Sequence, residues 1–325
     1  MKSLPKARYI VFALLLVILV VVPAVRDPER KDLTADAREL FAGNYVELDQ
    51  GYVRYYLTGP TDGPIVVLVG GLTTSLELFN DEREFLNAAG YRTLSFDLFG
   101  RGGSDRPSDL AYDQRTFNQQ LSDLLAALDI SAAVHLVGQS LGGGIAVSWA
   151  AENPQKVLSL FLQSSAGYLA EPPAMLGVLK TPLVGEYLWW LVGNTFILSG
   201  VDGYFVDKDK TRNAADSVKN QLSTAFEYNG YRYAVLETVR NFGAENMESP
   251  FRSVGAMSIP MQIVWGREDA TIPVSNVQQL TTWLADKPHV VILEGVGHMP
   301  MLEAPEAVFP LLTAHLSGVR AASGE

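Results

Sequence analysis

The chain has 325 residues, a formal net charge of −11 at pH 7 and no cysteine. The negative charge argues against a nucleic-acid partner, because nucleic-acid phosphates require a basic surface. The lack of cysteine excludes disulfides, thiolate metal sites and lipid-modified cysteines. The four histidines are dispersed without metal-ligand spacing, so we expect no metal and no cofactor.

The N-terminal segment is basic and then strongly apolar. Lys2, Lys6 and Arg8 precede an uncharged run over residues 9–25 that is dominated by Leu, Val and Ile. As an α-helix this run of 17 residues would span about 26 Å, close to the roughly 30 Å hydrocarbon core of a bilayer. The run is therefore long enough to anchor the chain in a membrane.

A cleaved signal peptide is the alternative interpretation of this segment. The apolar run is long for a signal peptide, and Val22-Pro23-Ala24 is a poor match to a small-x-small cleavage site. Basic residues flank both ends, so the charges favour neither orientation. We predict that residues 1–32 anchor a domain of residues 33–325 outside the cytoplasm, in a periplasm or lumen. Secretion after signal cleavage is the alternative localisation.

Beyond the first 32 residues, apolar runs alternate with helical stretches. The pattern predicts a hairpin over residues 47–58, and then strands near residues 65–69, 92–97, 133–138, 157–162, 261–266 and 289–293. Strands that alternate with helices favour a parallel sheet covered on both faces, and continuously apolar strands suit such burial. About 290 residues are enough for one large domain with an insertion.

A Gly-x-Ser-x-Gly pattern follows the strand predicted at residues 133–138. It joins this β-rich run to a helical stretch of small residues, as a nucleophile elbow requires. Gly138 and Gly142 lack the Cβ atoms that would collide across so tight a turn. We interpret Ser140 as the nucleophile, and the backbone N–H of Leu141 as a donor to the oxyanion that its attack creates.

The strand pattern stops between residues 166 and 258. This stretch is rich in proline and aromatic residues and looks helical over residues 214–226 and 231–239. We expect the run Leu-Trp-Trp-Leu-Val at 188–192 to contact an acyl chain. The alternative is that the aromatic residues pack only against one another.

A serine nucleophile needs a base, and the base needs an orienting acid. Three of the four histidines have structural interpretations: His135 lies within a strand, His289 begins one, and His315 lies in a terminal helical pattern. His298 instead lies on a glycine-rich loop directly after the last strand, where such sheets assemble their sites. We therefore expect His298 to be the base.

The acid is expected after the strand at 261–266, where Glu268 and Asp269 both lie in the following loop. Gly-x-x-Asp-x-x-x-Pro in this loop is similar to the acid loop of α/β-hydrolases, and Gly-His-x-Pro-x-x-Glu-x-Pro-Glu from residue 297 looks like their histidine loop. The order Ser140, Asp269, His298 is also that of this family. The resemblance favours Asp269 over Glu268, which remains the alternative acid.

The resemblance covers roughly residues 44–316 and implies further roles. In Gly-Gly-Leu-Thr-Thr-Ser at 70–75, many relatives have His-Gly-x, and the N–H of x is the second oxyanion donor, which matches Leu72. Gly70 replaces the usual histidine here. The segment from Asp97 to Ser104 resembles a loop in which the aspartate braces the site.

Particular residues exclude two alternatives within this family, a different nucleophile and a different place for the acid. Epoxide hydrolases and haloalkane dehalogenases of this fold carry Asp where this chain has Ser140. Some members place the acid after the strand at 157–162, but Gln163-Ser164-Ser165 offers no carboxylate there.

The sequence thus predicts an α/β-hydrolase fold: a mostly parallel eight-stranded sheet with helices on both faces, a helical cap insertion at about 166–258 and an N-terminal membrane-anchor helix. The predicted activity is hydrolysis of carboxylic esters, including acyl glycerols or similar lipid-like esters, through a Ser-His-Asp triad. The alternatives are carbon–carbon bond hydrolysis, amide or peptide hydrolysis, acyl transfer, or a non-catalytic membrane-tethered interaction protein. The expected partners are the substrate and the membrane, with no obligate protein partner.

Overall fold

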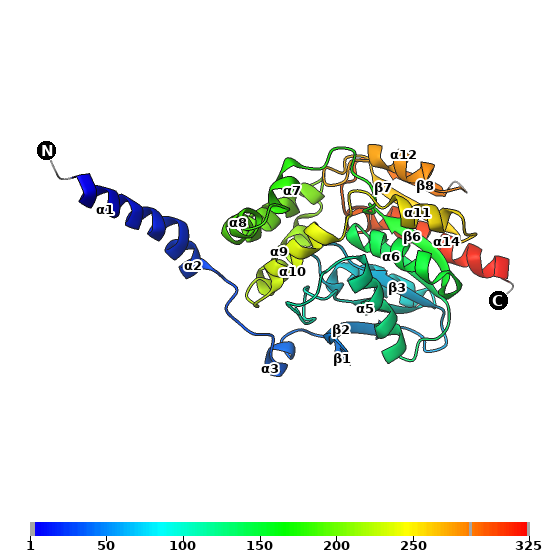
Figure 1. Cartoon of the computed structure of the whole chain (residues 1–325). Helices are drawn as coiled ribbons and strands as arrows, with labels where there is room; N and C mark the ends of the chain where they lie inside the picture. Colours follow the sequence, from blue (N-terminus) through cyan, green and yellow to red (C-terminus); the bar gives the residue numbers. More distant parts are fainter. Residues whose placement is uncertain (1–3, 286–287, 324–325) are drawn as a thin grey trace.

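The computed structural model describes residues 4–285 and 288–323. Its centre is an eight-stranded sheet in the order β1-β2-β4-β3-β5-β6-β7-β8 (Figure 1). β2 runs antiparallel to both β1 and β4, and all other neighbours are parallel. The strands are β1 Asn44–Leu48, β2 Gly51–Thr58, β3 Ile65–Val69, β4 Arg92–Phe96, β5 Val134–Gln139, β6 Val157–Gln163, β7 Met261–Gly266 and β8 His289–Leu293. The predicted eight-stranded, mostly parallel sheet is confirmed.

Helices cover both faces of this sheet because successive side chains of a strand point to opposite faces. Val67 and Val69 pack in one buried cluster with residues of α5, α6 and α11, whereas Val66 and Leu68 pack in a second cluster with residues of α4 and α14. The helices outside the insertion and the N-terminal region are α4 Asn80–Ala88, α5 Gln114–Ala127, α6 Leu141–Glu152, α11 Glu248–Gly255, α12 Ser275–Thr282, α13 Pro300–Glu303 and α14 Pro305–Ser323, with short 3₁₀ turns η2 Leu76–Phe79 and η3 Pro154–Lys156.

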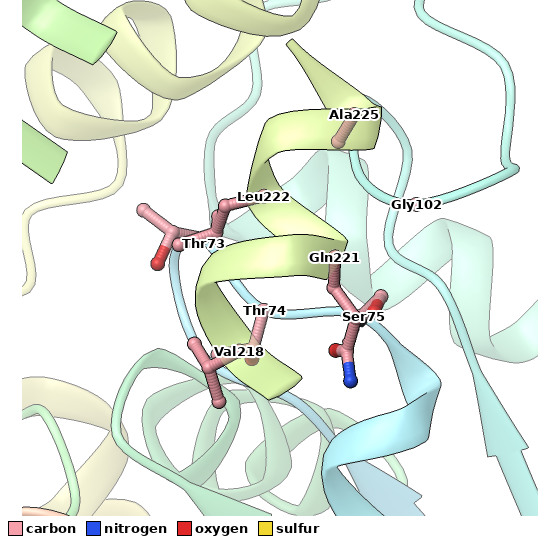
Figure 2. Close-up of a pocket in the computed structure, with 8 residues that line it drawn as sticks. All are labelled: Thr73, Thr74, Ser75, Gly102, Val218, Gln221, Leu222 and Ala225. Carbon is pink, nitrogen blue, oxygen red and sulfur yellow. Dashed lines mark hydrogen bonds between the residues drawn. The ribbon is translucent and has the colours of Figure 1, made fainter. Parts of the chain in front are cut away.

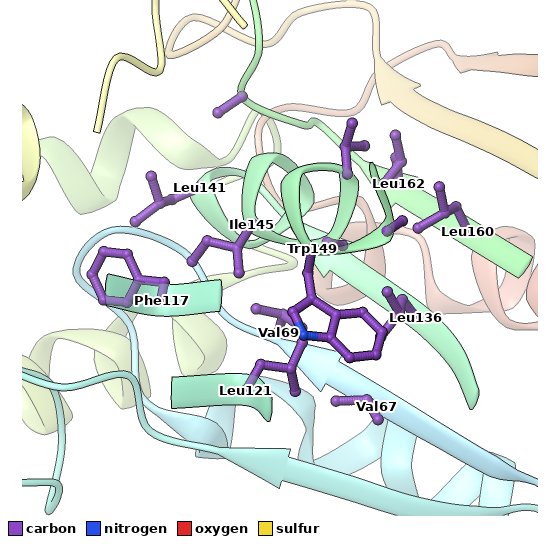
Figure 3. Packing of buried hydrophobic residues seen from close by; sticks show 14 of the residues in the cluster. Val67, Val69, Phe117, Leu121, Leu136, Leu141, Ile145, Trp149, Leu160 and Leu162 are labelled. Atoms are coloured by element: carbon purple, nitrogen blue, oxygen red, sulfur yellow. The ribbon is translucent and has the colours of Figure 1, made fainter. Parts of the chain in front are cut away.

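Trp149 fixes α6 against the sheet. Its fully buried ring lies among Val67, Leu121 and Leu136, at the centre of the packing that Figure 3 shows. The indole Nε1 donates a hydrogen bond of 2.9 Å to Ser122 Oγ on α5. The helix that begins directly after the elbow serine therefore has a fixed position over β3 and β5.

The segment between β6 and β7 is helical. It comprises α7 Ala174–Leu179, α8 Val184–Val201, the 3₁₀ turn η4 Asp202–Tyr204, α9 Arg212–Ala225 and α10 Tyr231–Asn241, followed by α11. The helices predicted over 214–226 and 231–239 correspond to α9 and α10. The residues of α7 to α10 are called the insertion below. α11 differs from them, because Phe251 and Val254 pack in the sheet cluster that contains α6. The division of the chain at residues 32, 166 and 258 stays a prediction.

The N-terminal helix extends away from the body of the molecule (Figure 1). It consists of α1 Leu4–Leu16, a π-helical turn η1 Val17–Val21 and α2 Val22–Arg26, and the short α3 Ala35–Arg38 follows. The stretch Arg8–Arg26 has a mean hydropathy of 2.7 and none of it is buried. Among the described residues it is the one helix long and apolar enough to cross a membrane, and a signal sequence has the same character.

Candidate active site

Ser140 occupies a strained turn between β5 and α6. Its φ of 52° and ψ of −121° are rare for a residue with a side chain. A Cβ on Gly142 would lie 2.0 Å from Val69 O, and one on Gly138 would lie 2.5 Å from Gly142 O. Glycine is therefore required on both sides of the serine. The Ser140 N–H donates to Gln163 O at 3.0 Å, which ties the elbow to β6.

The structure brings Ser140, His298 and Asp269 into one series of hydrogen bonds. His298 Nε2 lies 3.0 Å from Ser140 Oγ, and His298 Nδ1 lies 2.8 Å from Asp269 Oδ2. Only 2% of His298 and 4% of Asp269 is exposed, so the contact between these two side chains is shielded from water. The other Asp269 oxygen accepts the N–H groups of Thr271 and Ile272 at 2.8 and 2.9 Å. Such a series can pass the serine proton to the imidazole while the carboxylate stabilises the positive charge that forms.

The remaining histidines and the alternative acid lie elsewhere. His135 Nδ1 contacts Ser159 Oγ at 2.8 Å inside the sheet, and His289 is exposed at the start of β8. His315 lies in α14, where burial lowers its pKa to about 4. Glu268 is exposed and accepts the Val296 N–H at 3.2 Å.

Two residues without a predicted role hold the loop that carries His298. Tyr204 O, in the insertion, accepts the His298 N–H at 2.7 Å. The buried Glu303 carboxylate accepts the N–H of Gly297 at 2.6 Å and that of Val206 at 2.7 Å. Because Glu303 is part of the histidine-loop pattern, its role could have been predicted from the sequence. Tyr204 contributes a backbone carbonyl, which no residue type reveals.

Asp97 connects the loops that follow β3 and β4. Its two carboxylate oxygens accept the N–H of Leu76 at 2.7 Å and of Gly103 at 2.8 Å. Burial raises the pKa of the Asp97 carboxyl, and the guanidinium of Arg54, 3.2 Å away, opposes this shift. These contacts agree with the bracing role that the family resemblance implied.

Leu72 and Leu141 both line the cavity that contains Ser140. Leu141 is the first residue of α6, and the first N–H groups of a helix have no partner within it. The helix N-terminus also favours a negative charge. Leu72 lies in the loop of residues 70–75, which is called the oxyanion loop below after its predicted role. In this loop Gly71 N donates to Thr74 Oγ1 at 3.0 Å.

The cavity above Ser140 has a volume of about 440 Å³ and is largely apolar. Its walls come from the oxyanion loop, the start of α6, the insertion with the segments on either side of it, and residues 270–272. One charged residue, Glu245, is among the described residues that line it. Within the described part of the chain, the structure contains no group of three or more His, Cys, Asp or Glu side chains that could hold a metal ion.

Of the run at residues 188–192, one residue lines the cavity above Ser140, and its contact with an acyl chain stays a prediction. Trp189 lines the cavity and is 5% exposed, whereas Trp190 and Leu191 line a different hollow against the N-terminal helix. These residues lie on α8, where each residue is rotated by about 100° from the one before. A continuous apolar run in a helix therefore faces in several directions.

Comparison with known proteins defines the class. A model of the α/β hydrolase fold matches residues 64–305, and the chain belongs to this family. Lipase 1 of Psychrobacter immobilis is 26% identical over 252 residues, 77% of this chain and 76% of that one. The 2-hydroxy-6-oxo-6-(2'-aminophenyl)hexa-2,4-dienoic acid hydrolase of Metapseudomonas resinovorans is 25% identical over 260 residues, 79% of this chain and 84% of that one. The crystal structure of a bacterial membrane phospholipase A aligns with a TM-score of 0.65 and 25% identity, over 98% of this chain and 99% of that one.

Proposed function

We propose that this protein is a membrane-anchored serine hydrolase that cleaves carboxylic esters, with acyl glycerols or similar lipid-like esters as substrates. The proposal rests on the hydrogen-bonded series Asp269, His298 and Ser140 at the wall of an apolar cavity. Ser140 is the nucleophile, His298 the base and Asp269 the acid. The N–H groups of Leu72 and Leu141 bind the oxyanion.

The distances fit the steps of acyl transfer. Ser140 Oγ bonds to the ester carbonyl carbon, and its proton passes to His298 Nε2, 3.0 Å away. The carbonyl oxygen becomes an oxyanion and accepts the two backbone N–H groups. The carbon–oxygen bond to the alcohol then breaks, and the alcohol leaves with the proton from His298. Water, deprotonated by His298, attacks the acyl-enzyme, and the carboxylic acid leaves as Ser140 regains its proton.

The charge of the cavity favours neutral esters over anionic substrates. A relative hydrolyses a dienoic acid, and binding such a carboxylate would require a cation or several donors. The charged residue among the described lining residues is Glu245, itself an anion, which pairs with Lys180. Carbon–carbon bond hydrolysis of an acid is therefore the less favoured candidate.

The apolar outer surface of the insertion favours a lipid as the substrate. Large apolar side chains of α7, α8 and their connection are exposed to between 37% and 83%: Met175, Val178, Leu183, Val184, Leu191, Val192 and Phe196. Met175 and Phe196 also line the cavity, so the cavity opens on this apolar surface. An amphiphile that diffuses in a bilayer against this surface would reach Ser140 without crossing water.

Contacts join the insertion to the N-terminal helix and to the residues directly after it. Tyr187 Oη donates to Leu19 O at 2.8 Å, and Trp190 Nε1 donates to Asp27 Oδ2 at 2.9 Å. Arg232 also pairs with Glu29, with 3.0 Å between Nε and Oε1. We infer that the helix anchors the domain outside the cytoplasm with the insertion against the bilayer. Release after signal cleavage is the alternative.

The test uses the full-length protein in detergent micelles. Wild type should hydrolyse p-nitrophenyl esters and react with a fluorophosphonate probe. Ser140→Ala should lose both, with turnover lower by about 10⁶-fold as for other serine triads, because the nucleophile is gone. An unchanged melting temperature would show that the fold survives. Equal labelling or hydrolysis by the alanine variant would exclude Ser140 as the nucleophile, and an inactive, unlabelled wild type would favour a non-catalytic protein.

A further inference from the structure

The oxyanion loop begins with two glycines, so its orientation depends on contacts from outside the loop. Gly70 stands where many relatives carry histidine, and Gly70-Gly71 gives the backbone before Leu72 unusual freedom. An oxyanion donor is effective only if it is held toward the oxyanion before the reaction begins. The structure therefore has to restrain this loop by other means.

The first restraint is the guanidinium of Arg101, which is completely buried. Arg101 Nε donates to Leu72 O at 2.8 Å, and Arg101 Nη2 donates to Thr238 Oγ1 on α10 at 2.8 Å. Nη1 donates to Phe99 O at 3.0 Å, so all three nitrogens are engaged in one plane. Arg101 thus connects the carbonyl of Leu72 to a helix of the insertion.

The second restraint comes from Tyr231, the first residue of α10. Its fully buried hydroxyl donates to Thr73 O at 3.0 Å. Two consecutive carbonyls of the oxyanion loop, those of Leu72 and Thr73, are therefore fixed through α10. With Gly71 N bonded to Thr74 Oγ1, the peptide that carries the Leu72 N–H is restrained on both sides.

A second helix of the insertion covers the same loop. Figure 2 shows α9 lying across Thr73, Thr74 and Ser75, with Val218, Gln221, Leu222 and Ala225 lining the contact. The space left between them is about 10 Å³, room for one water at most. Gln221 Oε1 lies 3.0 Å from Ser75 Oγ. The loop has no space in which to turn while the insertion stays in place.

We propose that Arg101, Thr238 and Tyr231 are positioning residues through which the insertion holds the Leu72 N–H toward the oxyanion, so that the insertion forms part of the oxyanion hole as well as the substrate cavity. This inference rests on the proposed function. It has a mechanistic consequence, because α10 also lines the cavity with Val235, Thr238 and Val239. A bound acyl chain packs against the same helix that holds the Leu72 N–H. Filling the cavity therefore keeps the oxyanion hole assembled.

Two pairs of variants of the full-length protein in micelles test the proposal. Tyr231→Phe removes the hydroxyl that binds Thr73 O, and its matched control Tyr233→Phe removes a hydroxyl on the same helix that donates to Ser108 O at 2.8 Å. Thr238→Val removes the acceptor of Arg101, and Thr238→Ser restores it. The readouts are kcat, KM and the inhibition constant of a trifluoromethyl ketone, whose adduct with the serine carries an oxyanion.

Tyr231→Phe and Thr238→Val should lower kcat by about tenfold, a fraction of the 10²–10³ lost when an oxyanion donor is removed. The trifluoromethyl ketone should bind more weakly by a similar factor. KM should stay within about twofold of wild type, because only the transition state is affected. Tyr233→Phe should behave as wild type, and Thr238→Ser should recover most of the kcat and ketone affinity that Thr238→Val loses.

Unchanged kcat and ketone affinity in Tyr231→Phe and Thr238→Val would overturn the inference, as would a change in KM alone, which would mean that these residues shape only the cavity. Equal losses in Tyr231→Phe and Tyr233→Phe would overturn it too, because they would reflect general loosening of α10. A wild type with no more hydrolysis than Ser140→Ala would instead refute the proposed function.

Discussion

The sheet side of the candidate site and the insertion above it are stabilised in different ways. Ser140, His298 and Asp269 lie on loops at strand ends, and each is held by short hydrogen bonds to backbone or to one another. The insertion is held by apolar packing and by long-range hydrogen bonds such as those of Arg101 and Tyr231. Its helix α8 leaves large side chains such as Phe196 and Leu191 exposed. The three side chains thus pair with one another and with nearby backbone groups, whereas the insertion presents a surface that a lipid environment would cover.

The first prediction concerns the hydrogen bond between Asp269 and His298 on the sheet side. Asp269→Asn should lower kcat/KM by about 10⁴-fold, because an amide stabilises neither the tautomer nor the charge that His298 requires. Glu268→Gln is the matched control, since its exposed side chain accepts the Val296 N–H, whereas His298 is bonded to Asp269. Steady-state hydrolysis of p-nitrophenyl butyrate measures both. If Glu268→Gln were the more damaging variant, the role of the acid would pass to Glu268.

The residues on the sheet side of the site could be predicted because their motifs reflect local constraints on the backbone. Gly138 and Gly142 are required by contacts within a few residues or with the adjacent strand, so the elbow is visible in a short pattern. The family resemblance then selected Asp269 over Glu268, a choice that spacing alone left open. In the structure Asp269, and not Glu268, contacts His298.

The insertion was less predictable because its decisive contacts are distant in sequence. Arg101 and Thr238 are separated by 137 residues, and Tyr231 and Thr73 by 158. No local pattern marks such pairs. α8 was not predicted as a helix because it is apolar on every side and shows no helical period.

A second prediction concerns a buried acid beneath the elbow. Glu82 on α4 is 1% exposed and accepts from Gln163 Nε2 at 2.9 Å, and burial raises its pKa from 4.5 to about 8. Between these two values the unfolded chain releases the Glu82 proton while the folded chain retains it. The free energy of unfolding therefore falls with rising pH by about 1.4 kcal/mol per unit from this group, until the folded pKa is passed.

Glu82→Gln removes this titration. Relative to wild type, the variant should gain stability as the pH rises from 5 to 8, and the difference should level off above pH 8. Urea unfolding at pH 5, 7 and 9 measures it, with Glu84→Gln on the exposed side of the same helix as the control. Parallel pH profiles for wild type and Glu82→Gln would show that Glu82 is ionised in the fold and that the sheet side tolerates an unpaired buried charge.

The last prediction concerns how the insertion affects the dependence of kcat/KM on acyl chain length. If the cavity binds an acyl chain, each buried methylene should raise kcat/KM by up to about fourfold, from about 0.8 kcal/mol of transfer free energy. Phe196 and Val192 are four residues apart on one face of α8 and are 53% and 41% exposed, but only Phe196 is among the residues that line the cavity. Phe196→Ala should therefore lower kcat/KM for octanoate by about threefold and leave acetate unchanged. Val192→Ala should alter neither ester in micelles. A wild type that prefers acetate would mean a cavity too short for lipids, and equal effects of the two variants would mean that α8 acts through its contact with the micelle and not through the cavity.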